Sequence, residues 1–497
     1  MKYISTRGNY SPVSASEAIK LGMVPEGGLF VPEKVPELSL EKILSKKDNS
    51  YQEIASWILE YFLSDFDKGE IKNAVNKAYN NENFLSELIT PLVSFDENTY
   101  IMELWHGPTA AFKDLALQLM PYLLNKAVKK SGSNKEIVIL VATSGDTGKA
   151  ALEGFKDVEG VKIIVLYPEN GVSKIQKDQM ITTGGSNTEV IAVKGNFDDC
   201  QNAVKKIFGD KNFNKKIKNN GFQFSSANSI NWGRLVPQIV YYFAAYFYLI
   251  KKEVIKSGEK INITVPTGNF GNILAAYYAY RMGLPVNKFI CASNENKILT
   301  DFIRSGKYDI KRKFKKTISP SMDILISSNL ERFLFEITNH DSERINHWYK
   351  QLNENGEFEI DEENVNKINE LFVGKYATEG ETKETIKQVY NNYDYLIDPH
   401  TGVALSCLGK YRNNKDKLKT NVVDSTANPY KFSKAVLESI KGELKEKDDY
   451  KIINKLKELT DTPMHRALAE LENESIKHYR KTSKDKVKEE ISDILFK

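Results

Sequence analysis

The chain has 497 residues, 41% hydrophobic and 27% charged, which is typical of a folded globular protein with more than one core. Its formal net charge of +4, from 70 basic and 66 acidic residues, gives no reason to expect a nucleic-acid or membrane partner. The three cysteines lack CxxC spacing, the six histidines lack metal-ligand spacing, and no apolar leader is present. We therefore expect a cytoplasmic protein without structural disulfides or a metal site.

The first predicted unit, residues 1–95, has helical segments on either side of a glycine turn. Ser14 and Glu17 form a capping box that begins a short helix, which Gly22 can end. The unit offers no nucleophile or ligand cluster, so we predict an N-terminal domain without catalytic groups. Its other expected elements are a strand over 29–31 and helices over 51–62 and 67–79.

The second predicted unit, residues 96–430, alternates apolar runs with helical segments. Continuous apolar runs are typical of parallel strands that are buried on both faces. The alternation predicts an α/β fold whose ligands bind at the loops beyond the carboxyl ends of the strands. The expected strands are 99–104, 137–141, 161–167, 190–193, 261–265, 289–292 and a last one that ends near 425. A buried helix is expected over 239–250, and a more polar, mostly helical stretch over 300–400.

The third predicted unit, residues 431–497, is rich in lysine and glutamate from residue 441 onward. Its charges alternate in sign, which favours a solvated helical face over a binding arm. Thr462 and Pro463 have the pattern of a helix start. We therefore expect a charged, helical C-terminal segment.

The segment 106–114, with sequence HGPTAAFKD, connects a predicted strand to a predicted helix over 115–127. Thr109 can cap that helix, which would place Lys113 in its first turn, where the helix dipole is positive. In a dry site both effects favour the neutral amine that a lysine needs to form a Schiff base. Taken alone, the pattern favours a surface lysine beside an aspartate.

The segment Gly268-Asn269-Phe270-Gly271-Asn272 lies between a strand and a helix. Two glycines and a helix N-terminus can direct backbone N–H groups at an anion, most plausibly a phosphate. The segment matches neither the dinucleotide fingerprint nor the P-loop, so a smaller phosphorylated cofactor is favoured. The alternative is a tight turn without a ligand.

Three further polar segments lie at the ends of predicted strands or at the start of a predicted helix. The loop 143–148 is rich in hydroxyl groups and could bind a carboxylate, and 228–234 combines amides, hydroxyls and Arg234 in a pattern suited to a second phosphate. Thr426 could donate a hydrogen bond to a neutral pyridine nitrogen. Each of these features alone also describes an ordinary helix cap or strand end.

Together, a candidate Schiff-base lysine, a phosphate cradle and a hydroxyl for a ring nitrogen are the parts of a pyridoxal 5′-phosphate (PLP) site. The chain resembles threonine synthases of the long type found in bacteria and fungi, from residue 1 to about 429. The resemblance implies PLP fold type II, with two mostly parallel sheets in two α/β subdomains and an extra N-terminal domain. The matching segments are 3–8, 25–32, 106–114, 142–148, 228–234, 267–272, 294–296, 319–325 and 425–429.

The resemblance also implies roles for individual residues. Lys113 would carry PLP and act as the catalytic base, and Thr426 would face its pyridine nitrogen. Asp146, with Ser144 and Thr147, would approach the ring oxygen and the substrate carboxylate. The cofactor would also contact Thr267, Gly268, Asn269, Phe270, Gly271 and Asn272, and the substrate phosphate would be held by Asn228, Ser229, Asn231 and Arg234. The sequence departs from the family pattern at Ala111, Gly233 and Asn428, where Leu, Ala and His are usual.

The function implied is that of a PLP-dependent lyase in threonine biosynthesis, which converts O-phospho-L-homoserine and water to L-threonine and phosphate. Lys113 would move protons at Cα and Cβ while phosphate leaves Cγ and water adds at Cβ. One alternative is a related phospho-lyase that releases 2-oxobutyrate from the same substrate. An amino-acid dehydratase would have no use for Arg234, and a non-catalytic binding protein would have no use for Lys113. We expect a monomer.

Overall fold

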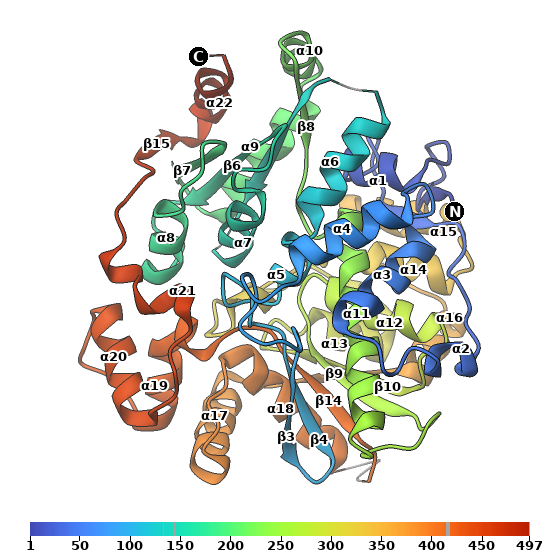
Figure 1. The fold of residues 1–497 in the computed structure, drawn as a ribbon, viewed down its shortest axis with the longest axis vertical. Helices are drawn as coiled ribbons and strands as arrows, with labels where there is room; N and C mark the ends of the chain where they lie inside the picture. The colour runs from blue at the N-terminus through green and yellow to red at the C-terminus, as the bar shows by residue number, and fades with distance from the viewer. Residues whose placement is uncertain (133, 144, 414–417, 497) are drawn as a thin grey trace.

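The computed structural model describes residues 1–132, 134–143, 145–413 and 418–496. Within them, two sheets dominated by parallel strands are covered by helices, which confirms the predicted α/β class with two mostly parallel sheets. In Figure 1 the smaller sheet lies above the larger one, and the short helix α5 (Asp114–Leu117) lies between them. The N-terminal helices, drawn in blue, pack beside the larger sheet.

The N-terminal unit contains the predicted helices and a two-stranded antiparallel sheet. Ser14 accepts a hydrogen bond from the Glu17 backbone N–H at 3.2 Å, and Gly22 ends this first helix as predicted. The Trp232 ring lies 5.3 Å from the Tyr3 ring and 5.6 Å from the Phe62 ring, so this unit shares a core with the next one. Its elements are β1 (Tyr3–Ser5), α1 (Ala15–Leu21), β2 (Phe30–Pro32), α2 (Leu40–Leu44), α3 (Tyr51–Phe62) and α4 (Lys68–Ala78).

The larger sheet has the strand order β13-β10-β9-β14-β4-β3, and only β3 is antiparallel to its neighbour. Its central strand β14 comes late in the chain and pairs in parallel with both β4 and β9. This pairing brings the segments 106–114, 267–272 and 426–431 to the same edge. The strands are β3 (Leu92–Asp96), β4 (Thr99–Glu103), β9 (Ile261–Pro266), β10 (Val286–Ser293), β13 (Phe372–Tyr376) and β14 (Asn421–Ser425).

The stretch 300–400 is mostly helical, as predicted, but it also contributes three strands. β13 is only five residues long and pairs with β10 at the sheet edge, so it lacks the apolar run of a central strand. The other two strands, β11 (Lys307–Asp309) and β12 (Glu357–Glu359), form a separate two-stranded antiparallel sheet. The helices associated with this half of the chain are α11 (Trp232–Lys251), α12 (Gly271–Arg281), α13 (Ile298–Ser305), η1 (Pro320–Met322), α14 (Leu330–Ile337), α15 (Ser342–Asn355), α16 (Glu362–Leu371), α17 (Glu379–Tyr393) and α18 (Pro399–Arg412).

The smaller sheet is entirely parallel, in the order β15-β7-β6-β5-β8. Helix α10 (Lys211–Asn219) and strand β8 (Phe222–Ser225) were not predicted, because α10 buries only Phe213 and Ile217 and β8 is four residues long. The other elements are α6 (Met120–Lys130), β5 (Glu136–Ala142), α7 (Asp146–Phe155), β6 (Val161–Pro168), α8 (Lys174–Ile181), β7 (Thr188–Lys194) and α9 (Phe197–Gly209).

The C-terminal segment, expected to be helical, also contributes strand β15 (Arg480–Ser483) to the smaller sheet. Its residues are polar, and ion pairs from Arg480 to Glu189 (3.2 Å) and from Lys481 to Glu169 (2.9 Å) hold it at the sheet edge. Thr462–Pro463 lies in an irregular stretch and does not begin a helix. In Figure 1 the segment runs in red past both sheets. Its other elements are η2 (Pro429–Phe432), α19 (Ser433–Lys441), α20 (Asp449–Thr460), α21 (Arg466–Ala469), η3 (Leu471–Asn473), η4 (Lys484–Lys486) and α22 (Val487–Leu495).

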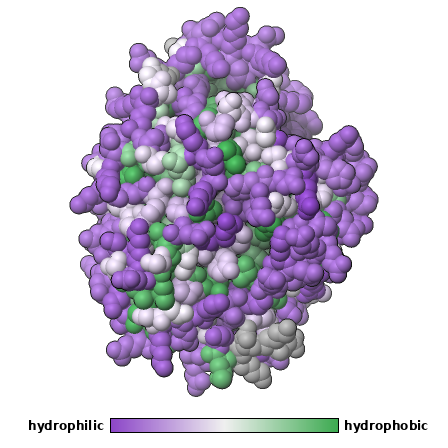
Figure 2. Space-filling model, turned by 90° about the vertical axis from the view of Figure 1, so that its right-hand side faces the viewer, coloured by the Kyte–Doolittle hydropathy of each residue, from purple (hydrophilic) through white to green (hydrophobic). Residues whose placement is uncertain are grey.

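The surface is mainly polar, and the apolar residues gather inside. The face shown in Figure 2 is mostly hydrophilic, with hydrophobic side chains in small groups between the charged ones. Inside, one cluster joins the N-terminal unit to α11, α12 and one face of each sheet, and two smaller clusters cover the opposite faces. Among the described residues, no helix has the length and apolar character needed to cross a membrane.

Candidate active site

Lys113 lies directly before α5, at the edge where the two sheets face each other. The expected cap by Thr109 is not formed, because the Thr109 hydroxyl and backbone N–H both donate to the buried Asp114 carboxylate, at 2.6 and 2.8 Å. The expected helix over 115–127 is also divided, since α5 ends at Leu117 and α6 begins at Met120. Lys113 is therefore the N-cap of a short helix rather than a first-turn residue.

Two backbone hydrogen bonds bring Lys113 and Thr426 together. The Phe112 N–H donates to the Thr426 carbonyl at 2.9 Å, and the Asn428 N–H donates to the Ala110 carbonyl at 3.0 Å. Thr426 is buried, and its hydroxyl has no hydrogen-bond partner within the described part of the chain. This hydroxyl is therefore available to a ligand.

The neighbouring hydroxyl of Ser425 is already engaged. It accepts hydrogen bonds from Trp105 Nε1 at 3.1 Å and from the Thr401 hydroxyl at 3.0 Å. The local structure thus distinguishes the two adjacent hydroxyl groups at the end of β14, and only that of Thr426 has no protein partner among the described residues.

A buried charge cluster surrounds the Lys113 amine. Lys113 Nζ lies 3.4 Å from Asp146 Oδ2, and Lys431 Nζ lies 2.9 Å from Asp146 Oδ1. Burial alone would raise the pKa of the Asp146 carboxyl, but the Lys431 and Lys113 ammonium groups hold it well below its usual range. Burial lowers the pKa of the Lys113 amine; Asp146 opposes this shift, and Lys431 and Arg234 add to it. Both shifts favour an ionised carboxylate beside a neutral amine.

The segment 268–272 connects β9 to α12 and has the geometry of an anion cradle. Phe270 adopts a left-handed conformation (φ 63°), and the backbone N–H groups from Gly268 to Asn272 have no acceptor among the described residues. Convergent N–H groups without acceptors at a helix N-terminus fit the phosphate of a cofactor. The adjacent Thr267 hydroxyl instead donates to the Val265 carbonyl at 2.7 Å.

Gly268 is required by its close contact with a second loop. A Cβ atom at this position would lie 2.6 Å from the Ser321 carbonyl oxygen. Ser321 is held in turn by His400, whose Nε2 accepts its backbone N–H at 3.2 Å and whose Nδ1 lies 2.6 Å from Asp398. Since Nε2 is the acceptor, Nδ1 carries the proton and donates to the carboxylate. No local pattern predicted this support, because Gly268, Ser321 and His400 lie far apart in the chain.

The Asn272 side chain faces away from the cradle. It donates to Asp424 Oδ2 at 2.9 Å and accepts hydrogen bonds from the hydroxyl groups of Tyr241 and Tyr242. Tyr242 also lies 2.7 Å from Asp424, whose pKa burial raises to about 7. Asn272 can therefore contribute its backbone N–H to the cradle, while its side chain fixes the start of α12 to β14.

Arg234, in the first turn of α11, is the centre of the second predicted anion site. Its Nη1 donates to the Ala227 carbonyl at 2.6 Å, but its Nε is buried without a partner in the described structure. Burial lowers its pKa to about 10, and Asp114 partly opposes the shift. At neutral pH the site therefore presents a buried cation with free hydrogen-bonding capacity.

The other residues predicted to hold a substrate phosphate differ in their availability. Ser229 contacts Ser328 at 3.2 Å, and Ser328 donates to Asn269 at 3.3 Å, so the two anion loops are linked. The half-buried Asn228 amide has no partner among the described residues. Asn231 instead caps α11, since its amide donates to the Ile19 and Ser226 carbonyls and accepts from the Gly233 N–H. Its role toward substrate stays a prediction.

In the loop 143–148, Asp146 lies beside Lys113 as described, and the half-buried Thr147 follows it on α7. The predicted site residue Ser144 lies outside the described residues. Lys431 and Gln176 were not predicted to be site residues, although both bind Asp146, with Gln176 Nε2 donating at 3.0 Å. No local motif marks either residue; their relevance comes from the fold.

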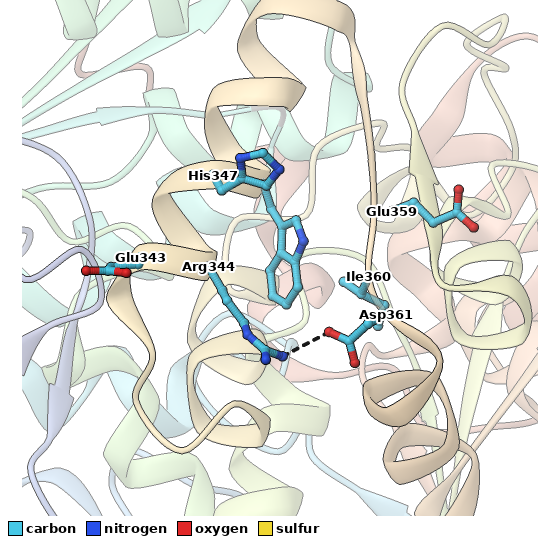
Figure 3. A pocket seen from close by; sticks show the side chains of 7 residues that line it. Glu343, Arg344, His347, Glu359, Ile360 and Asp361 are labelled. Carbon is cyan, nitrogen blue, oxygen red and sulfur yellow. Dashed lines mark hydrogen bonds and ion pairs between the residues drawn. The ribbon is translucent and has the colours of Figure 1, made fainter.

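A separate hollow of about 530 Å³ lies on the surface between α15 and β12 (Figure 3). Arg344 points across it to Asp361, with 2.9 Å between Nη1 and Oδ2. None of the predicted site residues lines this hollow, and most of its lining side chains are exposed and charged, so it is not the candidate active site.

Comparison with known protein families agrees with this geometry. Residues 2–79 match the family described as threonine synthase N terminus, and residues 84–423 match the family of pyridoxal-phosphate-dependent enzymes. Threonine synthase of Saccharomyces cerevisiae is 38% identical over 88% of this chain and 89% of its own length, and that of Pseudomonas aeruginosa is 37% identical over 88% and 90%. Human threonine synthase-like 1 is 42% identical over 86% of this chain, which spans 58% of that relative.

Solved structures give the same result. PLP-bound threonine synthase from Brucella melitensis superposes with a TM-score of 0.88 at 35% identity, covering 100% of this chain and 98% of that one. Threonine synthase from yeast superposes with a TM-score of 0.88 at 34% identity, covering 100% and 99%. The fold is PLP fold type II, and the cofactor is PLP. The chain belongs to the threonine synthase family of PLP-dependent enzymes.

Proposed function

We propose that this enzyme is a threonine synthase, which converts O-phospho-L-homoserine and water to L-threonine and phosphate. The observation that carries the proposal is the pair of linked anion sites: the backbone cradle at 268–272 for a cofactor phosphate, and buried Arg234 for a second one. An amino-acid dehydratase acts on a substrate without phosphate and has no use for the second site.

Each residue of the cofactor site has a distinct task in this proposal. Lys113 would bind the PLP aldehyde covalently, the N–H groups of 268–272 would hold its phosphate, and the free Thr426 hydroxyl would donate to its pyridine nitrogen. Asp146 would contact the ring oxygen, and Ser144 and Thr147 would bind the substrate carboxylate. PLP, when bound, withdraws electrons from the carbon that bears the substrate amine.

Lys113 then acts as the base of the reaction. Once the substrate amine has displaced it from the aldehyde carbon, Lys113 is a free neutral amine that removes the proton from Cα and one from Cβ, after which the bond between Cγ and the phosphate oxygen breaks. Cγ gains a proton and becomes the methyl group of threonine, a water molecule supplies the hydroxyl group at Cβ, and Cα regains its proton. Burial of the Lys113 amine suits this role, because a permanently charged ammonium group could not accept these protons.

Arg234, with Asn228, Ser229 and Asn231, holds the phosphate that leaves. A charge-assisted hydrogen bond to phosphate contributes about 1.5–3 kcal/mol, so Arg234→Gln should weaken binding of O-phospho-L-homoserine by about 10- to 100-fold. Isothermal titration against the cofactor-loaded enzyme measures this loss. Arg281→Gln, at a half-buried arginine that pairs with Glu336, is the control and should bind as the wild type does. Equal binding by the Arg234 variant would refute the assignment.

A related reaction is the second candidate, because the relatives at 42% identity are named threonine synthase-like. A phospho-lyase that releases 2-oxobutyrate would need the same cofactor and the same phosphate contacts. It would differ in its products, which include ammonia and no threonine.

The cellular setting is part of the proposal. The three cysteines, Cys200, Cys291 and Cys407, are buried free thiols, which fits a reducing cytoplasm. The expected monomer also stays a prediction, which light scattering of the purified enzyme checks.

A further inference from the structure

We propose that Lys431 is a positioning residue that neutralises Asp146 and thereby keeps Lys113 an uncharged, reactive amine. The inference rests on the proposed role of Lys113 as the residue that carries PLP. Lys431 belongs to η2, which follows Thr426 and begins the C-terminal segment. Its side chain is fully buried, a rare position for a lysine unless it is paired.

Lys431 joins three loops of the site. Its ammonium group donates to the Thr109 carbonyl at 2.9 Å and lies 2.9 Å from Asp146 Oδ1. Thr109 belongs to the loop that carries Lys113, Asp146 begins α7, and Lys431 itself follows β14. One buried cation thus fixes the positions of two loops relative to β14, the strand that Thr426 directly follows.

The contacts of Asp146 divide between its two oxygens. Oδ1 binds Lys431 at 2.9 Å and accepts from Gln176 Nε2 at 3.0 Å, whereas Oδ2 lies 3.4 Å from Lys113 Nζ. The carboxylate is therefore paired more closely with Lys431 than with Lys113. Its other oxygen faces Lys113, but the carboxylate does not need Lys113 as its counter-ion.

The charge balance follows from these contacts. A buried carboxylate needs a counter-ion, and without Lys431 the only ammonium group in contact with Asp146 among the described residues would be that of Lys113. With Lys431 present, Asp146 is already neutralised, so a proton on Lys113 adds an uncompensated charge. The charged groups that face Lys113 are Asp146, Lys431 and Arg234, and Asp114 faces Arg234 and Lys431 from α5.

This balance matters because only a neutral amine attacks an aldehyde. Lys431→Gln keeps a hydrogen-bond donor of similar length but removes the charge, so Lys113 should remain an ammonium group to higher pH. If the pH at which Lys113 loses its proton rises by one unit or more, covalent capture of PLP at neutral pH should slow by about tenfold or more. Lys431→Arg keeps the charge and should stay near the wild-type profile.

The test is the pH dependence of PLP capture, which is independent of turnover. Enzyme freed of cofactor is mixed with PLP between pH 6 and pH 9 and quenched with borohydride, and the adduct is located and quantified by peptide mass spectrometry. Lys149→Gln is the matched control, because Lys149 is a partly buried lysine on α7 that pairs with Glu153 at 2.8 Å instead of Asp146. We expect the profile to move upward in Lys431→Gln but not in Lys431→Arg or Lys149→Gln.

Several results would overturn the inference. One is a pH profile of PLP capture in Lys431→Gln that superposes on that of the wild type. Another is a loss of capture in Lys431→Gln that is equal at every pH. The third is a Lys431→Arg variant that captures PLP as slowly as Lys431→Gln. Should Lys431→Gln fail to fold, Lys431→Arg still decides, because a retained charge must retain the wild-type profile. Attachment of PLP to a lysine other than Lys113 in the wild type would instead refute the proposed function.

Discussion

Asp424 gives the protein a predictable dependence of stability on pH. Its Oδ2 accepts a hydrogen bond from Asn272 at 2.9 Å and lies 2.7 Å from the Tyr242 hydroxyl, while its buried Oδ1 has no partner among the described residues. Burial raises its pKa to about 7, whereas an unfolded aspartate has a pKa of about 3.9. Between these values the folded protein binds a proton that the unfolded chain has released, so stability falls as the pH rises from about 4 to about 7.

Replacing Asp424 with asparagine removes this dependence. From the two pKa values of Asp424, proton linkage predicts that the unfolding free energy of the wild type falls by about 3 kcal/mol between pH 5 and pH 8. Asp424→Asn has no proton to release at this position and should not show this fall. The new amide places an NH₂ group where Oδ1 has no partner, which costs about 1–3 kcal/mol at every pH. The variant should therefore be no more stable than the wild type at pH 5 and more stable at pH 8.

Urea unfolding followed by tryptophan fluorescence at pH 5 and pH 8 measures this difference. Asp485→Asn, at an exposed aspartate, is the control and should follow the wild type at both pH values. If the stabilities of wild type and Asp424→Asn changed in parallel with pH, Asp424 would not retain its proton in the folded state, and the reasoning would be wrong.

Three further predictions follow from individual contacts. Lys113→Ala should abolish both covalent PLP attachment, measured by mass spectrometry after borohydride, and turnover; retained turnover would exclude Lys113 as the cofactor lysine. Gly268→Ala would place its Cβ 2.6 Å from the Ser321 carbonyl and should weaken PLP affinity by about 5- to 150-fold in a cofactor titration, given an overpacking cost of about 1–3 kcal/mol. Asn231→Ala should lower the unfolding free energy by about 1–3 kcal/mol, because it removes the α11 cap and leaves the Ile19 carbonyl without its donor at 3.0 Å; unchanged stability in urea would contradict this.

The sequence predicted the strands and helices that have long apolar patterns. Strands β5, β6 and β9 and helix α3 lie where their apolar runs or helical spacing indicated, because burial of those side chains decides the local structure. Strands β8, β13 and β15 were missed. They are four or five residues long and are held by pairing with distant strands, which no local pattern records.

Candidate site residues could be predicted only where a single loop has a recognisable sequence pattern. The glycines of 268–272 and the position of Lys113 after a strand were visible in the sequence, and the structure places Asp146 and Arg234, which follow strands of the smaller sheet, near Lys113, whose loop is bonded to Thr426. The capping role of Thr109 was wrong, because its hydroxyl is used by Asp114. Such contacts depend on rotamers and tertiary packing that spacing along the chain does not specify.

The buried partners of the site could not be predicted for the same reason. Lys431, Gln176 and His400 act through residues between 30 and 322 positions away, so only the folded chain joins them to the site. Lys431 stands in the sequence Pro-Tyr-Lys-Phe, where an isolated lysine gives no indication that it is fully buried.

The measurement that tests the central claim most directly is product analysis in ¹⁸O-labelled water. Cofactor-loaded enzyme is incubated with O-phospho-L-homoserine, and the products are identified by mass spectrometry and ³¹P NMR. The proposed reaction predicts threonine and phosphate in equal amounts, with the label in the threonine hydroxyl group and none in the phosphate, because water adds at Cβ and the bond from Cγ to oxygen breaks. Formation of 2-oxobutyrate and ammonia, or label in the phosphate without threonine, would contradict it.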